Sequence, residues 1–317
     1  MKTRAVCRKR ERLAFSSEST AHAGRLCRPA AERIGVYSPC SAICAFEFLS
    51  LRVSVSLWPN RLCVSISSAS SNMYSTDLAY IHDAGFGDLA EGVAPEFIRL
   101  LRGHGIRSGR IVEAGCGSGI LARRLVDAGY DVTGFDRSSA MIRLARANAP
   151  GARFRVASLE RVRVPRCAAV IAVGEVITYA RSVRLFFRRA SAAIRTGGLF
   201  IFDFIESADR RTYPPRSRGG GDWAIVSQAE VNRAGTFLTR RITTFRKIGA
   251  GFGVPGSRFE PRTPEYRRSH EVHRVRIYSR DEIGRALTAA GFAFSMRRSY
   301  GSYRLLPGDV AVVAERQ

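Results

Sequence analysis

Lysine is almost absent from this chain of 317 residues: of its 51 basic residues, only Lys2, Lys9 and Lys247 are lysine. The formal net charge of +24 is a property that many nucleic-acid-binding proteins share. An arginine excess this large indicates the base composition of a genome rather than a binding surface. The arginines are also scattered, as on the solvated face of a helix at 181–195, and aromatic residues do not interleave with them. We therefore expect a partner other than RNA or DNA.

Long apolar runs are missing as well. The best candidate for a membrane span, 42–58, is too short and contains Glu47 and Arg52. No uninterrupted apolar core follows the basic start of the chain, and no small-residue cleavage site is evident, which argues against a secretory signal. We expect a cytoplasmic protein without a membrane anchor.

The first 72 residues hold five of the seven cysteines, but no pairs at zinc-ligand spacing, since Cys40 and Cys44 have no second pair of cysteine or histidine. This segment carries eleven basic and four acidic residues and no lasting periodicity. A targeting peptide, a disulfide or metal module, and translation from a start codon placed too early remain open. We expect a disordered extension over 1–72 and one α/β domain over 73–317.

Glycine is concentrated where a strand and a helix are predicted to meet. Residues 110–114 have the β-branched, apolar character of a buried parallel strand, and 120–128 has an apolar helical face that ends at Gly129. Gly115, Gly117 and Gly119 lie between them. Without a Cβ, such a turn bends sharply and approaches a ligand closely, while the helix start offers free amide donors. A tight structural turn is the alternative.

Asp136, at the end of the predicted strand 131–135, favours the ligand-binding interpretation. A carboxylate in this place can accept two hydrogen bonds from a ribose diol. The spacing, however, is E-x-G-x-G-x-G rather than the G-x-G-x-x-G of dinucleotide sites, and no Tyr-x-x-x-Lys pair is present. A nicotinamide-dependent oxidoreductase is therefore the weaker rival.

These residues resemble the class I S-adenosylmethionine-dependent methyltransferases, with Glu113 as the first-strand acid, the three glycines as the loop and Asp136 as the ribose-binding acid. The resemblance implies a Rossmann-like, doubly wound, seven-stranded and mostly parallel sheet with an antiparallel closing strand. It extends to the second helix around Met141, to the segment after the fourth strand, and to the closing strands near 292–299 and 310–315. A helix over 279–291 carries Ser279 and Glu282 at capping-box spacing.

The resemblance also implies the cofactor, S-adenosyl-L-methionine, and its contacts. The implied cofactor-binding residues are Glu113, Gly115, Cys116, Gly117, Gly119, Asp136, Arg137, Met141, Ser158, Leu159 and Gly174. An acid often follows the family's third strand, but this chain has Ala157, Ser158 and Leu159 there, with Glu160 just beyond. Cys116 has no identifiable base beside it and is predicted to be a small packed side chain.

The segment at about 205–278 matches the family only loosely and is predicted to select the acceptor. Residues 219–221 are three glycines, 222–246 and 270–278 alternate like strands, and 249–264 is a loop rich in glycine and proline. We expect antiparallel strands that form a β-rich cap over the carboxyl edge of the sheet, where ligands of open α/β sheets bind.

Three residues are candidates for the acceptor side, each with a structural alternative. Glu175 binds an amine, takes a proton, or caps a turn. Tyr179 faces the sulfonium or packs in the core. His82, together with Tyr74 and Tyr80, belongs to a lid over the cofactor or to simple packing.

No metal is expected. His270 and His273 are three apart in a predicted strand and so point to opposite faces, and Asp203 has no second acid nearby in sequence. Tyr300 and Tyr303 are predicted in a hairpin loop, on the surface or against substrate.

We predict methyl transfer to an O or N atom of a small-molecule acceptor. The alternatives are a non-catalytic S-adenosylmethionine-binding regulator and an RNA methyltransferase. The Asn/Asp-Pro-Pro-aromatic motif of base-modifying relatives is replaced by Gly174, Glu175, Val176 and Ile177. Oligomeric state is not predictable from these residues.

Overall fold

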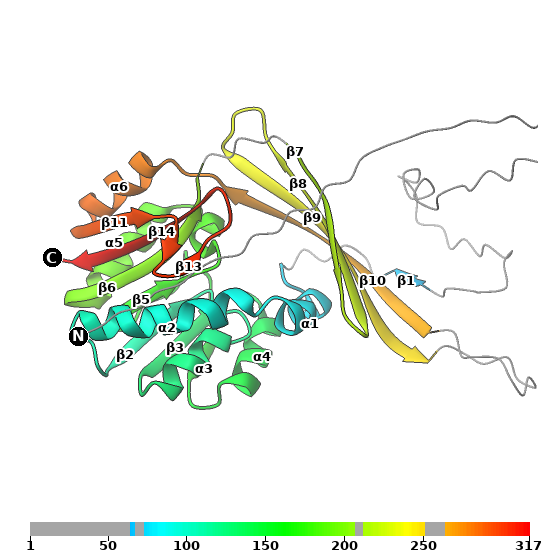
Figure 1. Cartoon of the computed structure of the whole chain (residues 1–317), viewed down its shortest axis with the longest axis horizontal. Coiled ribbons are helices and arrows are strands. Elements are labelled where there is room, and N and C mark those ends of the chain that lie inside the picture. The colour runs from blue at the N-terminus through cyan, green and yellow to red at the C-terminus, as the bar shows by residue number, and fades with distance from the viewer. Residues whose placement is uncertain (1–63, 67–72, 207–211, 251–263) are drawn as a thin grey trace, which may run out of the picture. The chain divides into compact units, whose positions relative to one another are not determined.

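The computed structural model describes residues 64–66, 73–206, 212–250 and 264–317 (Figure 1). All of them belong to one compact unit, Trp58–Gln317. Apart from 64–66, the extension expected over 1–72 lies outside the described residues, as does most of the loop predicted at 249–264.

A seven-stranded sheet forms the body of the domain, in the order β11-β14-β6-β5-β2-β3-β4. β14 is antiparallel to both of its neighbours, and the pairs among β2 to β6 are parallel. This is the predicted doubly wound sheet with its antiparallel closing strand. Its strands are β2 (Arg110–Ala114), β3 (Asp131–Asp136), β4 (Arg153–Val156), β5 (Cys167–Ala172), β6 (Ile194–Ile205), β11 (Phe292–Arg297) and β14 (Asp309–Arg316).

Helices accompany these strands, and the helix after Ser279 begins where the capping-box spacing predicts. The Ser138 and Ser279 hydroxyls accept hydrogen bonds from the third residue after them, Met141 and Glu282, both at 3.1 Å, which satisfies amides that a helix start leaves free. The helices are α1 (Thr76–Gly85), α2 (Asp88–Gly103), α3 (Ile120–Asp127), α4 (Ser139–Asn148), α5 (Val183–Ala193) and α6 (Arg280–Ala289), with a 3-10 turn, η1 (Val176–Tyr179).

A second, five-stranded sheet forms the predicted cap, in the order β1-β10-β9-β8-β7. Its strands are β1 (Val64–Ile66), β7 (Thr212–Gly219), β8 (Trp223–Val231), β9 (Phe237–Ala250) and β10 (Pro264–Arg276). β7 to β10 pair antiparallel, while β1 runs parallel to β10. Sequence reasoning missed β7, because Pro214 and Pro215 argue against a strand. The sheet tolerates them at its edge, where fewer backbone amides need a partner.

The cap packs on α1 through both apolar and charged contacts. Leu78 and Ile81 of α1 form a buried cluster with Trp223 of β8 and Ile242 of β9. Asp77, nearly buried, accepts two hydrogen bonds from the Arg267 guanidinium of β10. Figure 1 shows the cap strands passing beside α1. The first helix is therefore held between the cap and the helix 139–148.

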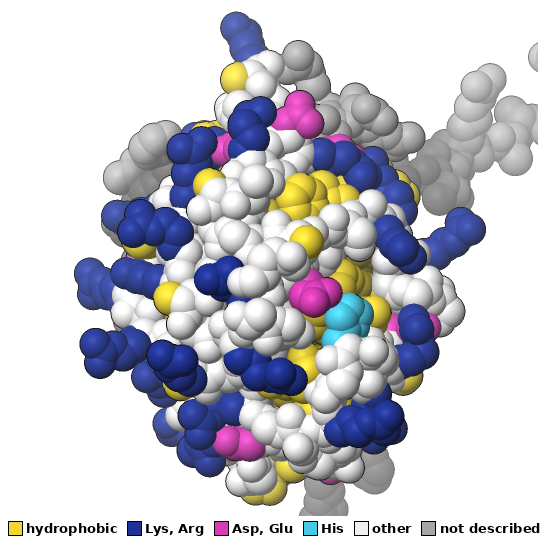
Figure 2. All heavy atoms as spheres, turned by 90° about the vertical axis from the view of Figure 1, so that its left-hand side faces the viewer, with side chains coloured by type: hydrophobic (Ala, Val, Ile, Leu, Met, Phe, Trp, Pro, Cys, Tyr) yellow, Lys and Arg dark blue, Asp and Glu magenta, His cyan; other side chains and the backbone are white. Residues whose placement is uncertain are grey.

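Basic side chains are dispersed over the surface drawn in Figure 2, with uncharged surface between them. Among the described residues, several arginines are paired with acids, for example Arg99 with Glu96 and Arg241 with Glu230. No helix among the described residues is long and apolar enough to cross a membrane.

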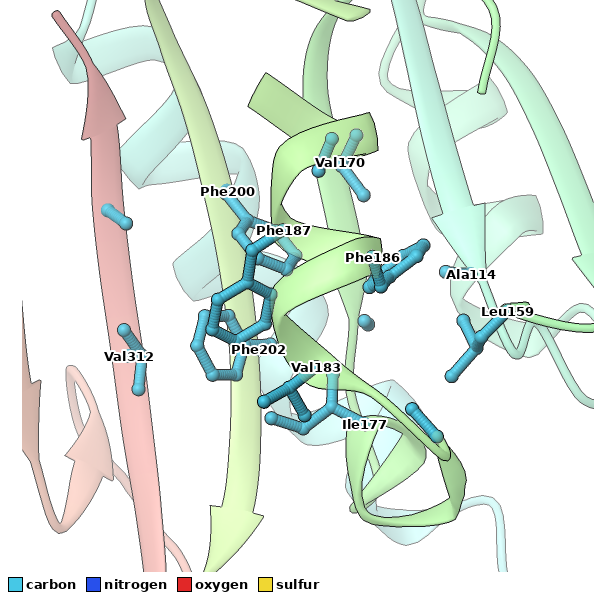
Figure 3. Close-up of a cluster of buried hydrophobic side chains, with 14 of the residues drawn as sticks. Ala114, Leu159, Val170, Ile177, Val183, Phe186, Phe187, Phe200, Phe202 and Val312 are labelled. Atoms are coloured by element: carbon cyan, nitrogen blue, oxygen red, sulfur yellow. The ribbon is translucent and has the colours of Figure 1, made fainter. Parts of the chain in front are cut away.

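The hydrophobic core lies on both faces of the large sheet because side chains alternate along a strand. On β6, Phe200 and Phe202 face α5 and α6, while Leu199 and Ile201 face α2 and α3. Phe187 of α5 packs on Phe200 with ring centroids 5.3 Å apart, as Figure 3 shows. This rigid layer fixes the carboxyl ends of the strands, which carry the candidate site.

Candidate functional site

The loop between β2 and α3 has the left-handed backbone that its glycines permit. Gly115, Gly117 and Gly119 have φ angles of 67°, 52° and 80°. A Cβ on Gly119 would lie 2.9 Å from the Cα of Ala145, and one on Gly115 would lie 2.5 Å from Val176, whereas one on Gly117 would meet nothing within 4 Å. Gly117 therefore borders open space, while Gly115 allows close packing against Val176 and Gly119 allows close packing against Ala145.

Asp136 ends β3 beside this loop. The Gly117 amide donates to its Oδ2 at 3.2 Å, and the Ser138 amide donates to its Oδ1 at 2.8 Å. Each carboxylate oxygen has a second lone pair that can accept from a ligand hydroxyl. Burial raises the pKa of Asp136, although both amides oppose this effect.

Glu113 lies at the floor of the same region and is almost fully buried. Its Oε2 has no hydrogen-bond partner among the described residues. Burial, with a smaller effect from Asp136, raises the pKa of Glu113 to about 8. A buried carboxyl that lacks a partner is costly, so this atom is suited to a donor or cation supplied by a ligand.

A single cavity brings these groups together with the loops after β4 and β5. Twelve of the fourteen predicted site residues line it: His82, Glu113, Gly115, Cys116, Gly117, Asp136, Arg137, Met141, Ser158, Leu159, Gly174 and Tyr179. Gly119 instead packs behind the loop against α4. Cys116 is buried and its pKa is well above the usual range because of burial, which agrees with the predicted packing role.

An apolar wall of this cavity was not predicted. It is formed by Met73, Phe86, Leu89, Ala90, Val173 and Val176. The amphipathic pattern of α2 indicates a buried face, but its contact with a cavity depends on how α1 and α2 fold over the loop. His82 lies in this wall, with its ring 5.4 Å from Tyr74 and 5.9 Å from Phe86. Burial lowers the pKa of His82 to about 4, so its imidazole is neutral.

Tyr80, considered with His82 as part of a lid, is outside this cavity lining. Its hydroxyl donates to Asp222 at 3.1 Å, and the Arg246 guanidinium lies 3.2 Å from the centre of its ring. Of the two interpretations given for Tyr80, a lid residue or simple packing, these contacts favour simple packing.

Glu175, predicted as an acceptor-side residue or a turn cap, is not among the residues that line this cavity. Its carboxylate lies 2.7 Å from the Arg240 guanidinium of β9. The backbone of Glu175 is left-handed, with a φ of 62°, and this turn is held by Asp203, which accepts from the amides of Gly174 and Glu175. Tertiary pairing with the cap, which local sequence does not show, explains the difference.

Asp203 anchors the turn after β5 through the amides of Gly174 and Glu175. It is buried, and Tyr300 donates to it at 3.5 Å, while burial raises the pKa of Asp203 to about 7. Tyr300 is therefore buried and away from both the surface and the cavity, contrary to prediction. Among the residues that the structure describes, no group of histidine, cysteine and acidic side chains could hold a metal ion.

The cap contributes three polar residues that sequence reasoning did not assign to the site: the partly buried Arg240 and the buried Glu271 and His273. Tyr179 lies 3.3 Å from the Nδ1 atom of His273, and His273 lies 2.9 Å from Glu271. The predicted opposite orientation of His270 and His273 is confirmed, since His273 is buried and His270 bonds to Thr243 instead. In the sequence, the strand-like alternation of residues 270–278 was the signal that one face of this strand would be buried.

Residues 111–198 match a family model described as a methyltransferase domain. Over 97 residues the chain is 38% identical to the ubiquinone biosynthesis O-methyltransferase of Methylobacterium sp. (strain 4-46). This match covers 29% of this chain and 39% of that protein. The chain thus spans about two fifths of the length of the curated relatives it matches.

Solved structures extend the similarity of fold. An S-adenosylmethionine-dependent methyltransferase from Clostridium acetobutylicum has a TM-score of 0.62 at 14% identity, covering 75% of this chain and 97% of that one. The sugar N-methyltransferase KedS8 from Streptoalloteichus has a TM-score of 0.59 at 18% identity, covering 84% and 99%. At these identities the likeness shows the fold.

The family match covers β2, the glycine loop and the strands through the start of β6, and the surrounding sheet has the order and the antiparallel closing strand expected for this family. The cofactor of the family is S-adenosylmethionine. Residues 111–198 thus match a methyltransferase domain, and the chain has the fold of S-adenosylmethionine-dependent methyltransferases.

Proposed function

We propose that this protein transfers a methyl group from S-adenosylmethionine to an O or N atom of a small molecule. The observation that carries this proposal is the single cavity that joins the glycine loop and Asp136 to Tyr179, the residue that contacts the cap. Ligands of open α/β sheets bind at this edge.

The residues around the cavity fit the cofactor. Gly117 leaves space for close approach, and Asp136 keeps lone pairs for a ribose diol. The unpartnered carboxyl of Glu113 is suited to an ammonium group. Contacts along the rest of the ligand are assigned to the remaining predicted lining residues: Gly115, Cys116, Arg137, Met141, Ser158, Leu159 and Gly174.

When bound, the cofactor supplies an electrophilic methyl group on a sulfonium. The protein's part is to align the acceptor, exclude water and, for an acceptor that must lose a proton, receive it. Tyr74, Phe86 and Met73 shield the cavity on the side of α1. Tyr179 and the neutral imidazole of His82 are the polar side chains proposed for the acceptor.

A small-molecule acceptor agrees with the relatives, which include a ubiquinone biosynthesis O-methyltransferase and a sugar N-methyltransferase. The arginines on the face drawn in Figure 2 are dispersed and form no continuous basic surface on that face.

Calorimetric titration of the full chain tests the proposal, with S-adenosylmethionine, S-adenosylhomocysteine and NAD measured in parallel. We expect micromolar binding of the two adenosyl-sulfur ligands and none of NAD. A screen of small amines, phenols and alcohols with methyl-labelled cofactor then tests transfer. Failure of both sulfur ligands to bind would overturn the proposal, and binding without transfer to any acceptor class would favour a non-catalytic regulator.

A further inference from the structure

Three polar side chains form a hydrogen-bonded chain from the cavity into the cap. The Tyr179 hydroxyl lies 3.3 Å from Nδ1 of His273, and Nε2 of His273 lies 2.9 Å from Oε2 of Glu271. His273 and Glu271 are 1% and 4% exposed. Tyr179 lines the cavity, whereas neither cap residue is part of its lining. A ligand in the cavity would thus reach Tyr179 and meet the other two only through it.

The surroundings of Glu271 fix the direction of the proton donors. Its carboxylate accepts from the amides of Tyr74 and Ser75, at 2.7 and 2.8 Å, and from the Ser75 hydroxyl at 2.6 Å. Burial acts to raise the pKa of Glu271, but the hydrogen bonds from His273, Ser75 and Tyr74 outweigh it and hold the pKa below its ordinary value.

An ionised carboxylate only accepts hydrogen bonds, so Nε2 of His273 must carry the hydrogen. In the neutral ring Nδ1 is then an acceptor, and the Tyr179 hydroxyl donates to it. The same order of groups, a reacting hydroxyl, an imidazole and an orienting carboxylate, activates hydroxyls in many enzymes.

We propose that Tyr179 is the group that accepts the proton of the methyl acceptor, and that His273 and Glu271 are positioning residues that make it basic. This inference rests on the proposed methyltransferase function. It adds a proton relay of Tyr179, His273 and Glu271, the last two from the cap. Binding of the cofactor at the glycine loop does not depend on this relay.

The proposed step balances within the groups named. The acceptor's O–H or N–H bond breaks and its proton passes to the Tyr179 oxygen, while the proton of Tyr179 passes to Nδ1 of His273. The acceptor's electron pair forms the bond to the methyl carbon, and the electron pair of the broken carbon–sulfur bond stays on sulfur. The resulting imidazolium faces the carboxylate of Glu271, which stabilises its charge.

Packing holds the relay in place. The Tyr179 ring packs against Ile205, Val231 and Leu238. The Tyr74 ring lies 5.0 Å from the His273 ring. Arg240 is also close enough for its charge to favour the phenolate, against the larger opposing effect of burial, which leaves the pKa of Tyr179 raised. An activating base beside Tyr179 is therefore needed for it to accept a proton near neutral pH.

The test measures the nucleophilicity of Tyr179 without an acceptor. The full chain is treated with the tyrosine-reactive probe 4-(2-aminoethyl)benzenesulfonyl fluoride, and the rate at each tyrosine is followed by peptide mass spectrometry. We expect His273→Gln to slow labelling of Tyr179 at least 10-fold, and His270→Gln, on the opposite face of the same strand, to change it less than 2-fold. Equal rates in the two variants would overturn the relay.

A measurement on the unsubstituted chain covers the case in which His273→Gln does not fold. Nitrogen-15 NMR of the histidine rings at pH 7.5 should show His273 as the Nε2–H tautomer, with its signal assigned by position-specific labelling. An Nδ1–H tautomer would overturn the relay, because Nδ1 could not accept from Tyr179.

Titration of the same proteins with S-adenosylhomocysteine separates this inference from the proposed function. Binding to wild type and to His273→Gln, together with slowed labelling, supports both. Binding with unchanged labelling overturns the relay alone. Absence of binding to the wild-type chain overturns the proposed function and removes the methyl acceptor as the source of the proton.

Discussion

The guanidinium of Arg240, on the cap strand β9, lies 2.7 Å from the carboxylate of Glu175, on the turn after β5. The two side chains are 29% and 14% exposed, so the pair is mostly withdrawn from water. It joins the cap to the same turn that Asp203 holds from the sheet side. The position of the cap over the cavity thus depends on a charge pair rather than on the covalent connections alone.

Replacing Arg240 by methionine should lower the free energy of unfolding by about 2–4 kcal/mol, because it leaves the Glu175 carboxylate buried without its cation. Urea denaturation measures this change. Arg241→Met is the matched control, since its partner Glu230 and Arg241 itself are both more than half exposed, and its loss should cost about 0–1 kcal/mol. Similar losses in the two variants would show that the Arg240 pair is no stronger than a surface pair.

Asp136→Ala should weaken S-adenosylhomocysteine binding by about 1–3 kcal/mol, because charge-assisted hydrogen bonds to the ribose would be lost. Calorimetric titration gives the change directly. Asp131→Ala, at the other end of the same strand and paired with Arg110, should leave the affinity unchanged. An unaltered affinity in Asp136→Ala would remove Asp136 from the site.

Alanine at Gly119 and at Gly117 should have different consequences. At Gly119 the new Cβ meets the backbone of Ala145, and at both positions the left-handed backbone is strained by about 1–2 kcal/mol. Gly119→Ala should therefore reduce stability more than Gly117→Ala, whose Cβ borders open space and should chiefly weaken cofactor binding. Thermal melts and titrations of both variants separate the effects, and equal melting temperatures would contradict the packing argument.

Glu113 should make the protein less stable as the pH rises. Its pKa in the folded protein is about 8, above its ordinary value of 4.5, so the folded state binds more protons between these values. The stabilisation is fully present below about pH 4.5 and is lost as the pH rises through 8. Unfolding free energies measured from pH 5 to 8.5 should fall less steeply in Glu113→Gln than in wild type.

The contributions of Asp203 and Asp309, whose pKa values are raised by burial to about 7 and 8, have the same sign and remain in both proteins. The comparison of the two slopes therefore isolates Glu113. Glu230→Gln, at an exposed position, is the control and should keep the wild-type slope. Identical slopes for wild type and Glu113→Gln would show that Glu113 is not held protonated.

The cofactor side of the site was predictable because its information is local. A strand, three glycines and a helix, all within 110–127, fix the loop, and Asp136 follows at the end of the neighbouring strand. Parallel strands place their carboxyl ends at one edge, so these residues meet wherever the sheet forms. Ten of the eleven predicted cofactor-binding residues line one cavity for this reason.

The acceptor side was decided by the tertiary structure. Arg240, Glu271 and His273 lie more than 60 residues beyond the loops they contact, on strands whose register no local pattern specifies. A shift of one residue along β10 would turn His273 outward and His270 inward, because side chains alternate along a strand. The sequence by itself determined the sheet, the glycine loop and Asp136 through short-range patterns, and only the long-range packing of the cap decided that Glu175 is paired and that His273 lies behind Tyr179.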